Sequence, residues 1–491
     1  MTSFFRTCTI IAATAMAAAC NNAADDDVTR IAFIGSPDDL TKTGVRLSPA
    51  GQHIRAAKAE GIVRLNETGE VVPAIAERWI VTEDGLSYIF RLRNSDWSDG
   101  RALTANTVRA SLQRNIRNLR GTSLGLDLAI IDDIRAMTGR VIEIRLNKPM
   151  PQFLQLLAQP ELGLLRDGAG TGPMMSEQTG TGVRLSVLPP ENSGMPPVEG
   201  WQEAQRAIFV TSQSAEAATQ AFEDGETDAV FNGTLSNLPL ADIGPLSAGT
   251  VRLDAVFGLY GIAVRSRNGF LADAENREAL ALAIDRETIL QPFNIGGWIA
   301  TTRIIPPNLP DANVAQGERW ADLSLETRQE RARARVTAWK NANAGTVPRL
   351  SLALPDGPGS DIMMRELSAD YAVVGIELVR AEDGQRSELV LVDQLARYGD
   401  VRWFLNQLNC AVARGICSSE ADRLVAQALR EDDPATRLAL LTDAERVLLS
   451  ENGYIPIGAP IRWSLIRGGV EGFEENRWGL HPLFPMALRP I

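Results

Sequence analysis

The stretch from Glu83 to Arg93, EDGLSYIFRLR, combines a turn with a strand that has one buried and one exposed face. Asp84-Gly85 is a dipeptide typical of tight turns between strands. After it, apolar and polar side chains alternate from residue 87 to residue 94, as a half-buried strand requires. A second dipeptide of this kind, Asp99-Gly100, follows the strand. We therefore expect hairpins on both sides of it.

Outward from this strand, the chain alternates between strand-like and helix-like segments. Thr104 can cap a helix over residues 104–119, whose apolar side chains recur at helical spacing. The other expected strands include 30–33, 141–146, 256–264, 350–354, 389–392 and 401–408, and the other expected helices include 276–290, 323–342, 360–374, 419–430 and 434–451. This alternation predicts an α/β fold with mixed sheets.

Size and charge narrow the class of protein. The chain has 491 residues, more than a single hydrophobic core usually serves, so we expect two or three lobes. Its 49 basic and 61 acidic side chains give a formal net charge of -12. Non-specific binding to nucleic acid needs a basic surface. No nucleic-acid partner is therefore expected.

The first twenty residues have the features of an export signal. Arg6 lies in a short basic start, and the apolar run over residues 9–16 is too short to span a bilayer. The run ends at Ala17-Ala18-Ala19-Cys20, which resembles a bacterial lipobox. We expect a lipid on Cys20 and a polar tether over residues 21–28. The alternative is cleavage near Ala19 that leaves Cys20 unmodified.

Two cysteines, Cys410 and Cys417, remain in the body of the chain after export. An oxidising compartment favours a disulfide between them that closes a small loop. A metal-binding pair is the alternative. It lacks nearby ligands, because the only histidines in the chain, His53 and His481, are distant in the sequence. We expect no metal site and no cofactor.

Short motifs lie in a fixed order along the chain: G-x-x-x-P followed by A-E-R-W in residues 69–79, D-G-L-x-Y-x-F-x-L-R in 83–93, G-T-G-P in 170–173, G-E-x-D in 221–228 and A-I-D-R at the end of 276–286. In this order they resemble the family-five extracellular solute-binding proteins, which bind peptides, nickel and some sugars. Each match is short. Their common order, from about residue 60 to residue 460, carries the resemblance.

The resemblance implies a two-lobed, periplasmic-binding-protein-like (type II) α/β fold with an additional α/β domain in the first lobe. Its cleft would close on a ligand by hinge motion. The expected division is a lipoprotein signal peptide at 1–20, a tether at 21–28, a first lobe at 29–48, 160–262 and 455–491, the additional domain at 49–159, and a second lobe at 263–454.

The function implied by the resemblance is an extracytoplasmic solute-binding lipoprotein of an ABC importer. Such a protein would be a monomer in the periplasm or at the cell surface, held to the membrane by Cys20. Its partners would be the permease subunits and a peptide or similar small solute.

The ligand itself stays open at this point. Peptide-binding members of the family usually carry Trp-x-x-Asp-Tyr in the second lobe, and the Asp pairs with the free amine of the peptide. In the comparable residues 400–408, Trp403 fits and Asn406 stands in place of the acid. A neutral amide cannot make a charge-assisted hydrogen bond to an ammonium group. Sugars, opines and metal chelates therefore remain alternatives, and the candidate cleft residues are Ser36, Arg402, Trp403, Phe404 and Asn406.

Two other functions compete with transport. An orphan receptor or sensor lipoprotein would have the same sequence features. A secreted hydrolase would need a nucleophile with its base, yet the chain has no Gly-x-Ser-x-Gly, no His-Glu-x-x-His and no Cys close to a His. We therefore expect no enzymatic activity.

Overall fold

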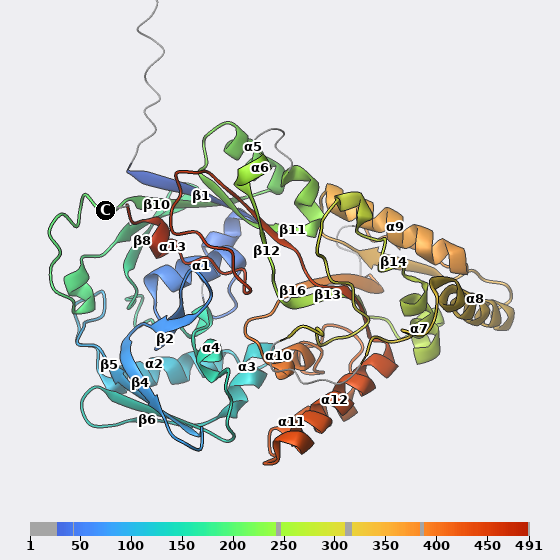
Figure 1. Cartoon of the computed structure of the whole chain (residues 1–491), viewed down its shortest axis with the longest axis horizontal. Coiled ribbons are helices and arrows are strands. Elements are labelled where there is room, and N and C mark those ends of the chain that lie inside the picture. Colours follow the sequence, from blue (N-terminus) through green and yellow to red (C-terminus); the bar gives the residue numbers. More distant parts are fainter. Residues whose placement is uncertain (1–26, 43, 242–246, 310–316, 383–386, 490–491) are drawn as a thin grey trace, which may run out of the picture.

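The computed structural model describes residues 27–42, 44–241, 247–309, 317–382 and 387–489. The export signal, Cys20 and nearly all of the tether lie outside the described residues. The described chain forms two lobes, each built on its own sheet, and an additional domain beside the first lobe (Figure 1). No described helix is long and apolar enough to cross a membrane.

The first lobe is built on a seven-stranded sheet. Its strands, in spatial order, are β12 (Val251–Asp254), β18 (Arg462–Ile466), β11 (Ala229–Thr234), β1 (Val28–Ile34), β10 (Ala207–Gln213), β9 (Gly182–Val187) and β8 (Met174–Thr179). β1 pairs in parallel with β10 and β11. The sheet is covered on one face by α1 (Pro49–Lys58) and α13 (Leu483–Met486), and on the other by α5 (Ala215–Glu223).

The additional domain contains the turn and the alternating strand of residues 83–93. Its hairpin strands are β2 (Val63–Leu65) and β3 (Val71–Pro73), its four-stranded sheet runs β4 (Ala76–Val81), β5 (Ser87–Leu92), β7 (Val141–Leu146) and β6 (Ile131–Ala136), and its helices are α2 (Ala105–Asn118), α3 (Ser123–Asp127) and α4 (Phe153–Leu157). The alternating strand is confirmed, because Tyr88, Phe90 and Leu92 are buried while Arg91 is exposed. The expected cap is also present: Thr104 Oγ1 accepts a hydrogen bond from Thr107 N at 3.3 Å.

The second lobe is built on a five-stranded sheet in the order β15 (Glu377–Arg380), β14 (Arg349–Ala353), β16 (Leu389–Leu395), β13 (Gly258–Val264) and β17 (Tyr454–Gly458). One face packs against α7 (Ala274–Ala283), α8 (Leu325–Ala342) and α9 (Pro358–Val374), and the other against α10 (Val401–Asn406), α11 (Ser419–Ala428) and α12 (Pro434–Glu451). Every residue of β13 is buried, as expected for a strand covered on both faces.

Two expected elements differ from the structure. The strand expected over residues 401–408 is the helix α10, whose six residues are all buried. A short apolar run buried on all sides has no periodicity that separates strand from helix. Asp400 starts the helix by accepting a hydrogen bond from Arg402 N at 2.8 Å. The helix expected over 276–290 ends at Ala283, because Ile284 has an extended backbone.

The lobes are joined by two crossings, at residues 255–257 between β12 and β13 and at 459–461 between β17 and β18. The sequence placed the limits of the first lobe at 262 and 455, which fall inside β13 and β17 of the second sheet. It also placed α1 in the additional domain, whereas Ala50, Ile54 and Ala57 of this helix pack on the first-lobe sheet.

Cys410 and Cys417 are joined by a disulfide bond. The loop that it closes packs against the end of β13, where Ile416 N donates to Val264 O at 2.7 Å. Cross-linking lowers the entropy of the unfolded chain, which stabilises the folded protein by about 2 kcal/mol for so short a loop. We expect the double variant C410S/C417S to lose about this much free energy of unfolding, as measured by urea denaturation. An unchanged midpoint, with reductant having no effect on the parent protein, would contradict this.

Candidate functional site

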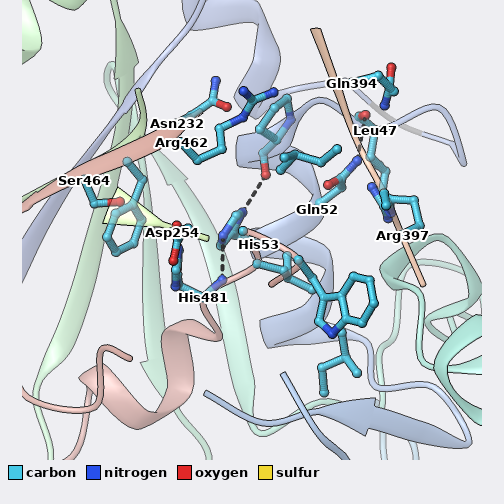
Figure 2. A pocket seen from close by; sticks show the side chains of 18 of the residues that line it. Leu47, Gln52, His53, Asn232, Asp254, Gln394, Arg397, Arg462, Ser464 and His481 are labelled. Atoms are coloured by element: carbon cyan, nitrogen blue, oxygen red, sulfur yellow. Dashed lines mark hydrogen bonds and ion pairs between the residues drawn. The ribbon is translucent and has the colours of Figure 1, made fainter. Parts of the chain in front are cut away.

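A cavity of about 300 Å³ lies between the two lobes (Figure 2). The first lobe contributes residues of α1, β11 and β18 to its wall, and the second lobe contributes the end of β16. Leu65, Gln159, Asp254 and residues 478–481 also line it. The cavity therefore exists only where the lobes meet, and its volume is at the lower end of the range for small-molecule sites, roughly 300–1,000 Å³.

An ion pair joins the lobes at this cavity. Arg462 of β18 and Asp393 of β16 approach to 2.7 Å between Nη1 and Oδ1. Arg462 is only 8% exposed, and its Nε has no hydrogen-bond partner among the described residues. A buried guanidinium with an unused donor costs free energy until an acceptor reaches it. Arg462 also lines the cavity, so it places a positive charge in the wall.

A second set of bonds closes the rim of the cavity. Arg397, just after β16, donates from Nε to Gln159 Oε1 at 2.7 Å and from Nη2 to Glu161 Oε2 at 2.6 Å. Gln159 returns a bond from Nε2 to Arg397 O at 2.7 Å. These contacts hold the second lobe against the first lobe and the additional domain, so the structure shows the lobes closed.

The two histidines that are far apart in the sequence meet in the wall (Figure 2). His481 N donates to His53 Nε2 at 3.1 Å, and His53 Nδ1 lies 2.7 Å from Pro49 O. Because Nε2 accepts, Nδ1 carries the proton and donates. Burial lowers the pKa of His53 to about 3, which keeps the ring neutral. His481 Nε2 lies 3.1 Å from Asp254 Oδ2, and its Nδ1 lies 3.1 Å from Glu474 O.

Aromatic rings give the cavity its apolar surface. Trp463 and Trp478 line it, and their indole N–H groups donate to Thr234 O and Gly69 O at 2.9 and 3.0 Å. With these donors used, the rings offer only carbon to a ligand. Asn232, which donates from Nδ2 to Ile34 O at 2.8 Å, adds an amide next to Arg462 (Figure 2).

The residues selected from the sequence lie elsewhere. Ser36 is exposed at the start of a short 3-10 helix, Pro37–Leu40, and does not line the cavity. The other four are brought together on α10, where all are buried and none lines the cavity: Arg402, Trp403, Phe404 and Asn406. Sequence reasoning missed Arg462, Asp393 and Arg397, which follow no motif.

A second cavity, of about 510 Å³, lies beside the crossings, and residues 255–257 and 459–461 line it. Its wall is more apolar and includes Phe257, Trp298 and Pro460. Asp254 lines both cavities. The described residues include no group of three His, Cys, Asp or Glu side chains placed to hold a metal ion.

A family model described as bacterial extracellular solute-binding proteins, family 5 Middle, matches residues 70–381, which is more than half of the chain. The chain belongs to family 5 of the bacterial extracellular solute-binding proteins. It is 25% identical to the probable di/tripeptide-binding protein 5 of Pseudomonas aeruginosa, with 86% of this chain and 88% of that protein covered. It is 23% identical to the periplasmic murein peptide-binding protein MppA of Escherichia coli, with 85% of each chain covered.

The fold of this family 5 protein is that of oligopeptide-binding proteins. The crystal structure of Haemophilus influenzae OppA in complex with the peptide RPPGFSPFR superposes with a TM-score of 0.78 at 16% identity, covering 94% of this chain and 99% of that one. The expected two-lobed fold is confirmed. The chain is a solute-binding protein.

Proposed function

We propose that this family 5 protein captures a short peptide, or a solute of similar size with a free carboxylate, in the cavity between its lobes. The observation that carries the proposal is the buried guanidinium of Arg462, which lines the cavity and pairs with Asp393 of the other lobe. Asp393 provides the opposite charge in the same wall. A zwitterionic peptide has one end to match each of these charges.

The size of the cavity favours the smallest peptides. Its volume of about 300 Å³ is enclosed by both lobes and by two indole rings. A long peptide would have to leave through the rim, where Arg397 bonds to Gln159 and Glu161. Di- and tripeptide binding, as in the name of the Pseudomonas relative, is consistent with this volume.

Delivery to an ABC permease is the role that follows from this binding. The protein would act as a monomer in the periplasm or at the cell surface, anchored through a lipid on Cys20. Both histidines of the cavity have their ring nitrogens engaged. The ring of His53 bonds to the backbone of Pro49 and of His481. The ring of His481 lies within hydrogen-bond distance of Asp254 and of the backbone oxygen of Glu474. Neither is free to serve as a general base, which supports binding rather than catalysis.

A thermal-unfolding screen tests the proposal. The purified protein is heated with di- and tripeptides, amino acids, sugars, an opine and a nickel–histidine chelate. A ligand at about one hundred times its Kd should add roughly 2.7 kcal/mol of stability and raise Tm. We expect the rise with short peptides. A rise with only a sugar, opine or chelate would replace the peptide in the proposal. No rise with any compound would favour an orphan receptor.

A further inference from the structure

The last residue of α3, Asp127, is fully buried where the additional domain meets the second lobe. Its partners come from α10, on the other side of that contact. Asn406 Nδ2 donates to Asp127 Oδ1 at 2.6 Å, and Arg402 Nη2 donates to the backbone oxygen of Asp127 at 3.3 Å. Two of the residues that the sequence placed in the ligand site therefore bind across the domain contact.

This contact is incompletely hydrogen-bonded. Asp127 Oδ2, Tyr398 Oη and Arg402 Nε are all buried, and none has a hydrogen-bond partner of good geometry within the described residues. The Tyr398 hydroxyl faces the Asp127 carboxyl group. A proton on Oδ2 would give that oxygen a bond to donate to Tyr398 Oη. An ionised Asp127 could instead accept a bond from the tyrosine hydroxyl, so it is the burial of the carboxyl group, and not the number of its bonds, that favours the neutral form.

The charges around Asp127 oppose one another. Burial raises its pKa to about 7, and the carboxylate of Asp400 adds to the rise, whereas the guanidinium of Arg402, the hydrogen bond from Asn406 and the nearby hydroxyl of Tyr398 lower it. The desolvation cost dominates because no water reaches the carboxyl group. In water the pKa of an aspartate is about 3.9.

Opening of the lobes would break this contact. The chain passes between the two sheets only at 255–257 and 459–461, within the described residues, and rotation there moves α10 away from the additional domain. Asp127 would then face water, and its pKa would return to the ordinary range. The closed arrangement therefore holds a proton that the open arrangement releases.

We propose that Asp127, with Tyr398, Arg402 and Asn406, forms a proton-dependent latch between the additional domain and the second lobe. The closed form binds the proton more tightly, so closure is favoured as the pH falls through the pKa of Asp127 in the closed form and disfavoured as the pH rises above it. The latch lies outside the ligand cavity, so it sets the balance between open and closed forms without touching the solute.

Distance measurement between spin labels tests the latch directly. One label replaces exposed Asn118 on α2 of the additional domain, and the other replaces exposed Ala426 on α11 of the second lobe, with Cys8 and Cys20 changed to serine. For a pKa of about 7, the ratio of closed to open molecules should rise about tenfold between pH 8 and pH 6. The short-distance population should grow accordingly.

Two variants separate the latch from other effects of pH. D127N is neutral at every pH and keeps an oxygen for Asn406, so its short-distance population should be high at both pH values. D370N is the matched control, because burial raises the pKa of Asp370 to about 6 but its carboxylate bonds to Asp285 N within the second lobe. It should respond to pH as the parent does. A parent distribution that ignores pH, or a D127N protein that keeps the response, would overturn the proposal.

Discussion

The variant E445Q should lose about 3–5 kcal/mol of unfolding free energy, the cost of removing one partner from a buried ion pair. Glu445, on α12, is fully buried and pairs with Arg303, whose side chain is 2% exposed. Glutamine keeps the shape and removes the charge with which Glu445 pairs with the guanidinium. Urea denaturation should therefore show a large fall in the transition midpoint with little change in slope.

A surface pair on the same helix gives the matched control. Asp443 pairs with Arg446 at 3.0 Å, but both side chains are more than half exposed. D443N should therefore cost less than about 1 kcal/mol. If E445Q were as mild as D443N, the buried pair would not be holding the segment around Arg303.

Glu445 also anchors the main chain. It accepts hydrogen bonds from Ile304 N and Ile305 N at 3.0 and 2.9 Å. Arg303 and Ile304 line the second cavity beside the crossings. One buried carboxylate thus positions both a side chain and a stretch of backbone at the junction of the lobes.

The sequence predicts the elements best where local pattern decides the structure. The strand at 87–92 shows its buried face through alternation, and the helix at 105–118 shows its start through Thr104. The spacing of Cys410 and Cys417 pointed to the bond that joins them. In each case the deciding partners lie within about one turn or one strand of each other.

Local pattern fails where packing decides. Residues 401–406 are buried on every side, so nothing in their order separates helix from strand. Comparison with the family motif put Asn406 in the cleft, whereas in the structure it lies on a helix and bonds to Asp127. Asp400 then occupies the loop between β16 and α10. It accepts a hydrogen bond from Arg402 N and so caps that helix.

The cavity could not be predicted because its members are distant in the sequence. His53 and His481 are 428 residues apart, and the Arg462–Asp393 pair connects strands of different sheets. Neither pairing leaves a periodic or local trace. Only the order of the strands, with two crossings between the lobes, brings these side chains together.

The variant R462Q should bind free-acid peptides about 10- to 100-fold more weakly, because a hydrogen bond to a charged group contributes roughly 1.5–3 kcal/mol. The loss should depend on the carboxylate. A peptide from the thermal screen and its C-terminal amide should differ strongly in affinity for the parent protein, and hardly at all for R462Q. Isothermal titration calorimetry with both compounds measures this.

Two further variants isolate recognition from stability. R462Q leaves Asp393 buried without its partner, so R462Q/D393N should recover stability without recovering discrimination between acid and amide. Arg252 on the neighbouring strand β12 pairs in register with Ser464 but does not line the cavity, so R252Q should bind both compounds as the parent does. Equal binding of acid and amide by the parent protein would remove Arg462 as the carboxylate receptor and leave peptide binding itself intact. Peptide binding would then depend on the residues at the end of β16, which line the same cavity.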